Sequence, residues 1–248
     1  MIANFKKLCY IIHMKQNFKY YKSAFTLAEV LITLGIIGVV AAITIPMLIH
    51  NSRAIEMRTR LLRANSIIQN GIGRMVADEV DVAELMETRD YGLLRKYFKD
   101  GGCAVPKNAS EGKYTNYYGN SSIGNAAAQK IIWPPYCLAD GMLLWFATLN
   151  EYRSAGGWTS TSYTVLLVDI NGLQGRPNKY GQDVFFWVFN PDDGRVHPFG
   201  KSVTYVLDNI ASSDYYKYCP GSKSWSEAGI GCTETALSDE AYFKRLKF

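Results

Sequence analysis

Four side chains with oxygen ligands lie within fifteen positions of one glycine-rich segment: Asp169, Asn171, Asn178 and Asp183. Carboxylate and amide oxygens are the ligands that calcium prefers. The spacing does not fit an EF-hand, because that loop would need a ligand at Leu173 and an acid at Tyr180. The simpler interpretation is a turn stabilised by Asn, Asp and Gly residues, and calcium binding is the alternative.

Motifs for catalysis are absent from the sequence. It has no GxSxG or HExxH, and five residues separate Gly194 from Gly200, where a phosphate-binding loop has four. A zinc site is disfavoured, since there is no CxxC motif and neither His50 nor His197 has a cysteine near it in the sequence. We therefore expect neither enzymatic activity nor zinc.

A single acid, Glu29, stands at the beginning of the most apolar stretch of the chain. Val30–Ile49 contains 20 residues and no charge. At about 1.5 Å per residue, a helix of that length spans about 30 Å, the thickness of the hydrocarbon core of a bilayer. A secretory signal fits poorly, because the apolar run continues past the small residues Ala41 and Ala42. A plain anchor leaves Glu29 unexplained unless its carboxylate points to water, since charges inside membranes are costly and rare.

The formal net charge of +5 lies entirely in the first 24 residues. That stretch contains no Arg, Asp or Glu and holds five lysines: Lys6, Lys7, Lys15, Lys19 and Lys22. From Phe25 onward, basic and acidic residues are equal in number. A basic nucleic-acid-binding domain is therefore disfavoured.

The residues around Glu29 carry a family resemblance. Lys22-Ser23-Ala24 followed by Phe25-Thr26-Leu27-Ala28-Glu29-Val30-Leu31 closely resembles the processing motif of type IV prepilins and type II secretion pseudopilins. The resemblance covers about residues 22–65. It implies that a prepilin peptidase cuts between Ala24 and Phe25 and methylates the new amine, and that Glu29 and Pro46 are the family's acid and helix proline. The family usually has Gly before the cut, where this chain has Ala24.

Assembly would give the acid a partner. After cleavage, Phe25 would carry an ammonium group at the positive end of a helix dipole, and Glu29 of an adjacent subunit would neutralise it. Pro46 is expected to kink or loosen the helix. The same helix contains four small residues: Gly35, Gly38, Ala41 and Ala42. These either permit close approach between helices or are ordinary components of a membrane helix.

The predicted layout has three parts: a basic leader (1–24), a long N-terminal helix (25–76, with 25–49 in the membrane) and an extracytoplasmic globular domain (77–248). Beyond Ile49, apolar residues recur with helical spacing at Ile55, Leu61, Leu62, Ile68, Ile72, Met75 and Val76. Short β-type segments follow at 142–149, 163–170, 184–190 and 196–199, the last two joined by a turn. The expected fold is α+β, with the long helix packed on an antiparallel sheet, which the resemblance also implies.

The cysteines point to an oxidising compartment. Cys9 lies in the leader, so removal of the leader leaves an even number in the mature chain: Cys103, Cys137, Cys219 and Cys232. Four cysteines permit three pairings, which the spacing does not distinguish. We expect nearest-neighbour pairs, Cys103–Cys137 and Cys219–Cys232, and the second resembles the disulfide-bounded loop of many pilins.

Together these features predict a structural subunit and not an enzyme. The expected protein is a single-pass precursor in the bacterial inner membrane that is processed and then polymerises through its N-terminal helix into a type IV pilus or a type II secretion pseudopilus. The mature length favours a minor pilin or pseudopilin. Expected partners are other pilin subunits, the prepilin peptidase and N-methyltransferase, the inner-membrane assembly platform and membrane lipid, with no nucleic acid. The alternative is a tip pilin whose β-domain binds a ligand for adhesion or DNA uptake.

Overall fold

The computed structural model describes residues 25–82, 84–85, 91–102, 114–119, 135–150, 162–172, 175–203, 219–223 and 228–247. The chain divides into two compact units, Met1–Met47 and Leu48–Phe248. A single helix, α1 (Leu27–Ala77), contributes to both units. Its bounds differ from the predicted helix by two residues at the first end and one at the second.

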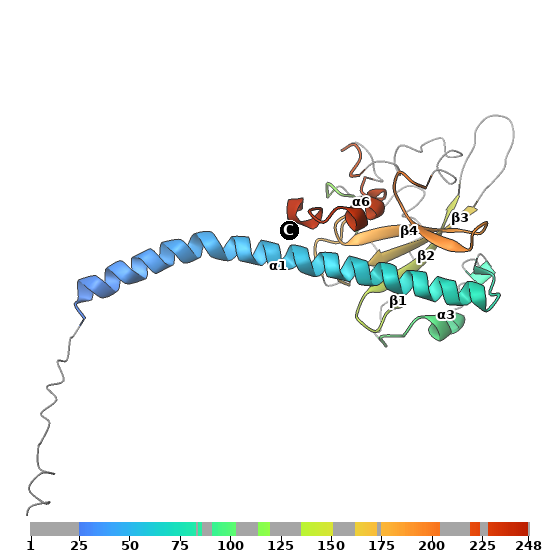
Figure 1. The fold of residues 1–248 in the computed structure, drawn as a ribbon, viewed down its shortest axis with the longest axis horizontal. Helices are drawn as coiled ribbons and strands as arrows, with labels where there is room; N and C mark the ends of the chain where they lie inside the picture. Colours follow the sequence, from blue (N-terminus) through green and yellow to red (C-terminus); the bar gives the residue numbers. More distant parts are fainter. Residues whose placement is uncertain are drawn as a thin grey trace, which may run out of the picture. The chain divides into compact units, whose positions relative to one another are not determined.

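The second unit contains a five-stranded antiparallel sheet (Figure 1). The strands follow one another in space as in sequence: β1 (Tyr136–Cys137), β2 (Leu143–Asn150), β3 (Ser162–Asp169), β4 (Val184–Asn190) and β5 (Arg195–Pro198). The expected hairpin joins β4 to β5, where the Gly194 N–H donates to the Asn190 carbonyl at 3.0 Å. Gly194 has a φ of 65°, a conformation that side chains disfavour, and it lies against Val76 of α1.

Residues 48–77 of α1 cover one face of the sheet (Figure 1). The helix buries residues spaced three or four apart, which places them on one face: Ala54, Met57, Leu61, Ala64, Ile68, Gly71, Ile72 and Met75. Two hydrogen bonds between α1 and the sheet fix the position of the helix on this apolar surface. The Trp187 indole N–H donates to Asn65 at 2.9 Å, and the Gln69 amide donates to the Val196 carbonyl at 2.6 Å.

The helix face predicted from the sequence was partly wrong. Leu61, Ile68, Ile72 and Met75 are buried as expected, but Ile55, Leu62 and Val76 are exposed. The buried face instead uses Ala54, Met57 and Ala64, because small side chains allow the helix backbone to approach the sheet closely. Ile55 is 61% exposed, so the outer face of α1 presents apolar side chains even beyond the predicted membrane segment.

The opposite face of the sheet packs against two aromatic side chains, Tyr114 and Tyr180, from segments outside the sheet. Tyr114 packs edge-on against Trp145, and Tyr180 packs edge-on against Phe186. The Thr233 hydroxyl accepts a hydrogen bond from the Phe186 N–H at 2.9 Å. Thr233 belongs to α6 (Cys232–Ser238), which precedes the short 3-10 helix η2 (Phe243–Arg245), and the buried side chains of both helices join the apolar cluster that contains α1. Both faces of the central strands are therefore buried.

The expected α+β fold is confirmed. The four predicted strands agree with β2 to β5 to within one residue at each end, while β1 and α6 were not predicted. A short helix, α3 (Tyr91–Tyr97), follows α1 along the chain. The predicted Cys219–Cys232 disulfide is present and joins the segment before α6 to its first residue. Cys137 is also disulfide-bonded, and its predicted partner Cys103 lies outside the described residues.

Two glycines of α1 provide a matched test of this packing. A Cβ on Gly71 would overlap the buried ring of Phe98, whereas a Cβ on Gly73 meets no atom within 4 Å. We expect Gly71→Ala to lower the free energy of unfolding by about 1–3 kcal/mol through overpacking. Gly73→Ala should raise it by about 0.5–1 kcal/mol, because alanine has the higher helix propensity.

Denaturant unfolding of the full chain in detergent measures both variants. Equal and small effects of the two substitutions would contradict the packing of α3 and its following residues against α1.

Candidate functional site

The beginning of α1 is held by its own side chains. The Glu29 carboxylate accepts hydrogen bonds from the Thr26 N–H at 2.8 Å and from the Thr26 hydroxyl at 2.9 Å. In return, the Thr26 hydroxyl oxygen accepts the Glu29 N–H at 3.2 Å. This reciprocal arrangement is a capping box, in which a Thr before the helix and a Glu three residues later satisfy each other's backbone donors. Thr26 was overlooked in the sequence, although the Thr-x-x-Glu spacing is the signal for such a cap.

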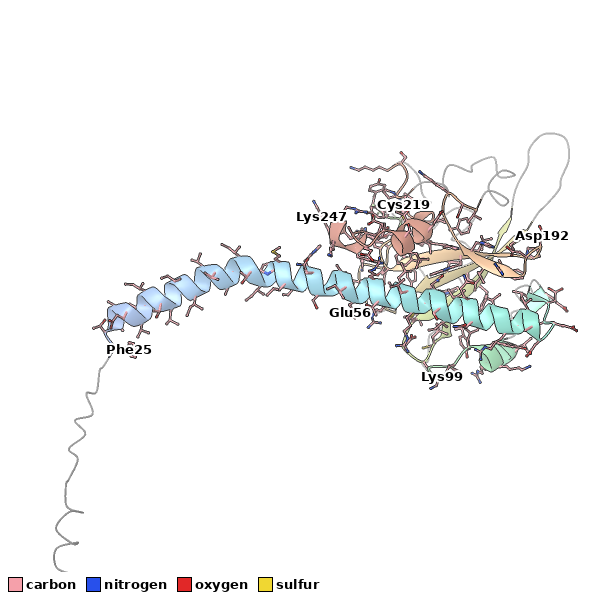
Figure 2. All side chains as sticks on the ribbon, in the orientation of Figure 1. Phe25, Glu56, Lys99, Asp192, Cys219 and Lys247 are labelled. Atoms are coloured by element: carbon pink, nitrogen blue, oxygen red, sulfur yellow. A yellow bond between two sulfur atoms is a disulfide. The ribbon has the colours of Figure 1, made fainter. Side chains whose placement is uncertain are left out.

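The capping box gives Glu29 a partner within its own chain. From the sequence, two environments were open to this carboxylate: water at the headgroups, or the amine of an adjacent subunit. In the isolated chain the carboxylate instead faces the first turn of its own helix. It is thereby held close to Phe25, which is exposed (Figure 2). Ala24, on the other side of the predicted cut, lies outside the described residues.

The first 21 residues of α1 have no protein around them in the described structure. Their large apolar side chains are all exposed, and no atom lies within 4 Å of a Cβ placed on Gly35 or Gly38. Pro46 lies inside the helix, which continues through it to Ala77. The helix is long and apolar enough to cross a membrane. An uncovered surface of this kind needs lipid or other helices to shield it from water.

The loop between β3 and β4 brings together the four residues that the sequence singled out. One oxygen of Asp169 accepts the Asn171 and Gly172 N–H groups at 3.1 and 2.8 Å. Asp183 accepts the Asn178 and Lys179 N–H groups at 2.7 and 2.6 Å. Both carboxylates are fully buried. They therefore fold the loop by satisfying backbone donors at its two ends.

The remaining contacts of the two carboxylates come from side chains. The Asn171 amide donates to Asp183 at 3.2 Å, and the Tyr114 hydroxyl donates to Asp169 at 2.8 Å. Tyr114 was overlooked, because it is 55 residues from its partner and no local pattern indicates the contact.

These bonds bear on the calcium prediction. Every carboxylate oxygen of Asp169 and Asp183 already accepts at least one hydrogen bond, whereas calcium takes six to eight oxygen ligands. In the part of the chain that the structure describes, no group of three His, Cys, Asp or Glu residues is placed to hold a metal. The buried Asn171 amide oxygen has no hydrogen-bond partner among the described residues. Hydrogen bonding alone accounts for the turn, and calcium binding stays a prediction.

Burial makes the two carboxylates costly to ionise. It raises the pKa of Asp169 to about 7, with a further contribution from the nearby Asp183 charge. Burial also raises the pKa of Asp183 to about 6. The backbone N–H groups that donate to its ionised form lower this pKa and so offset part of the effect. Because both pKa values exceed the ordinary 3.8, the folded chain binds protons more tightly than the unfolded chain between about pH 4 and 7. Folding is therefore favoured at the acid end of that range.

This direction of the pH dependence of stability provides a test of the carboxylate pair. From about pH 5 to about pH 8 the contribution of the pair to stability should fall by about 4 kcal/mol, since one pKa unit corresponds to about 1.4 kcal/mol. Asp169→Asn should remove most of this pH dependence and stabilise the chain at the alkaline end. Asp192→Asn, at an exposed aspartate in the β4–β5 turn, is the control and should leave the dependence unchanged.

Melting temperatures of the full chain in detergent across this pH range provide the measurement. The same titration examines calcium, because a cation bound to the ionised pair would raise the melting temperature at the alkaline end. An unchanged melting temperature with excess calcium and with a strong chelator would remove the calcium prediction.

Comparison with known proteins bears on the beginning of α1 alone. Residues 19–45 match the family model described as the prokaryotic N-terminal methylation motif. No curated protein and no solved structure matches the chain. The matched residues include Ala24, Phe25, Glu29 and the capping residue Thr26, so the resemblance stated from the sequence is confirmed over this region. The chain carries the prepilin-type cleavage and methylation signature of type IV pilins and pseudopilins, at the start of a helix able to span a membrane.

Proposed function

We propose that this protein is a structural subunit, cut by a prepilin peptidase between Ala24 and Phe25, N-methylated, and assembled through α1 into a type IV pilus or a type II secretion pseudopilus. The observation that carries the proposal is the methylation motif directly followed by an uncovered apolar helix. Residues 48–77 of the same helix contribute one face to the core of a folded α+β unit. Removing the 24-residue leader leaves 224 residues, a size that favours a minor pilin or pseudopilin over an abundant major one.

The charge of Glu29 has a role that capping alone does not explain. A helix cap contributes about 1 kcal/mol, whereas a carboxylate deep in a membrane costs about 2.5–3.5 kcal/mol on insertion scales. Capping therefore offsets only part of the cost when α1 is surrounded by apolar groups. A neighbouring subunit's N-terminal amine would supply a positive charge. We propose that this pairing makes burial of Glu29 favourable in the filament and positions each subunit against the next.

A ligand-binding role at a filament tip is the second candidate. It is favoured by a groove of about 290 Å³ between α1 and the residues around α3 and β1. Three basic side chains, Arg63, Arg74 and Lys99, line this groove, and Arg63 pairs with Asp140 at 3.0 Å. The excess of positive charge suits an anionic ligand. Such a ligand would bind without catalysis, and no motif for an enzyme accompanies the groove.

Processing can be tested directly at the N-terminus. When the full chain is expressed with a prepilin peptidase, intact-mass and peptide mass spectrometry should find a chain beginning at Phe25 with a methylated amine. Ala24→Gly restores the residue that the family usually has and should be processed at least as completely. Ala24→Leu should block the cut, because a peptidase pocket suited to glycine has no room for the bulkier leucine side chain. An intact leader, or cleavage near Ala42, would overturn the proposal.

The two roles of Glu29 can be separated by a pair of variants. Glu29→Gln keeps an oxygen that can accept the Thr26 N–H but removes the charge, so membrane insertion should persist while incorporation into filaments falls at least tenfold, equivalent to about 1.4 kcal/mol. Thr26→Val keeps the charge but removes the hydroxyl, and should incorporate nearly normally. Quantitative immunoblots of sheared filaments and of membranes measure both. Normal incorporation of the Gln variant together with loss in the Val variant would show that capping, and not charge pairing, is what matters.

A further inference from the structure

The apolar run of α1 ends at Ile49, within the second unit, and two other segments, the β3–β4 loop and the C-terminal turn, contact the helix beyond it. The His50 ring lies 2.8 Å from the Leu246 carbonyl, and Arg53 donates to the Arg176 carbonyl at 2.7 Å. Arg58 donates to the Asp239 carbonyl at 3.2 Å. At about 1.5 Å per residue, His50 and Arg53 lie within about 6 Å of the end of the run. The β3–β4 loop and the C-terminal turn are therefore level with the membrane boundary predicted from the sequence.

This end of the second unit is rich in positive charge. The basic residues outnumber the acidic ones seven to three: Arg53, Arg58, Arg60, Arg176, Lys244, Arg245 and Lys247 against Glu56, Asp239 and Glu240. We call the seven basic residues the basic collar. The acids are all used in ion pairs within the group, with Arg60, Arg245 and Arg58. Figure 2 shows Lys247 and Glu56 at this end of the unit.

The excess is notable because the mature chain is neutral overall. Arg176, Lys244 and Lys247 are exposed, and each lies on a segment that contacts the first turns after Ile49 or adjoins such a segment. These exposed positive charges therefore lie near the first turns of α1 after Ile49. Arg53 and Arg58 bond the folded unit, whereas the exposed charges of Arg176, Lys244 and Lys247 lie outside the apolar core between α1 and the sheet.

An open groove of about 690 Å³ lies at the same level. Its lining combines the apolar side chains of Leu48 and Ile49 with the basic Arg53 and with Arg60, which pairs with the acidic Glu56 of the same lining. Leu48 and Ile49 are 65% and 62% exposed. A surface with apolar groups on the hydrocarbon side and guanidinium groups directly above them matches the order of groups in a phospholipid, whose phosphate lies above its acyl chains.

We propose that the basic collar binds the phosphate groups of anionic phospholipids while the subunit is stored in the membrane. Phospholipid headgroups lie within about 5–8 Å of the hydrocarbon boundary, and Arg53 follows Ile49 by four residues, about 6 Å along the helix. Binding would hold the folded unit against the membrane surface, and withdrawal of the subunit into a filament would break these contacts. The inference rests on the membrane span and goes beyond the proposed assembly function.

Lysine acylation provides a test on the unaltered full chain. The chain is reconstituted in vesicles of phosphatidylcholine alone or of phosphatidylcholine with phosphatidylglycerol, and acylation rates are read by mass spectrometry. Lys244 and Lys247 should react about fivefold more slowly in the anionic vesicles, in line with the attraction of one basic residue to such a surface. Lys201, an exposed residue outside the collar, is the internal control and should change little. High salt should abolish the difference, because the screening length falls to about 3 Å at about 1 M.

A pair of arginine variants checks that the collar acts as a unit. Arg176→Gln removes an exposed collar charge and should reduce the slowing at Lys244 and Lys247, while Arg195→Gln removes an exposed charge from β5 and should not. Equal acylation in both vesicle types would overturn the lipid inference and leave N-terminal processing untouched. If inorganic phosphate slows the same lysines in neutral vesicles, the collar recognises a free anion and the inference is also overturned.

Discussion

One continuous helix must be stable in two environments, the apolar interior of a membrane and the water-exposed folded unit. The remaining features of the structure depend on this constraint. Residues 27–47 of α1 expose apolar side chains around the whole helix, whereas residues 48–77 bury a single face against the sheet. The first part therefore requires lipid or neighbouring helices, and the second supplies the core of the folded unit. Because Ala54, Ala64 and Gly71 keep the helix close to its partners, the outer half of α1 is as much a part of the fold as any strand.

The same constraint explains why charge is concentrated at the two ends of the apolar segment. At the first end, Glu29 caps the helix through Thr26 and places a negative charge next to the apolar segment. At the second end, His50 and Arg53 begin the polar region and are bonded to backbone carbonyls of the C-terminal turn and the β3–β4 loop. Between these ends the helix has no charge. Such a segment stays in a membrane until other helices replace the lipid, and the two charged ends define its position along the bilayer normal.

Local features were predicted from the sequence more successfully than contacts between distant residues. The apolar run and the alternating strands depend on neighbours in sequence, so α1 and β2 to β5 were predicted to within two residues. The buried face of α1 was predicted only in part, because apolar spacing does not distinguish Ile55, which is exposed, from Ala54, which packs on the sheet. Of the four oxygen-bearing residues of the β3–β4 loop, Asp169, Asn171 and Asp183 are joined by hydrogen bonds, and Asn178 contributes its backbone N–H. Tyr114, which completes the environment of Asp169, comes from a segment that no periodicity connects to it.

The carboxylate pair and one residue of the basic collar, Arg176, belong to the same loop, and this links the interior of the unit to its surface. Asp169 and Asp183 hold the two ends of the loop by accepting its backbone donors, and Arg176 lies between them in sequence. The Arg176 carbonyl accepts hydrogen bonds from Arg53 of α1 and from the Asn171 amide. Loosening of the carboxylate anchors would therefore displace the residue that bonds α1 at the level of the membrane boundary. Because burial makes ionisation of both acids costly, these anchors contribute less to folding stability at neutral pH than at acid pH. The same anchors hold Arg176 in a fixed position against α1.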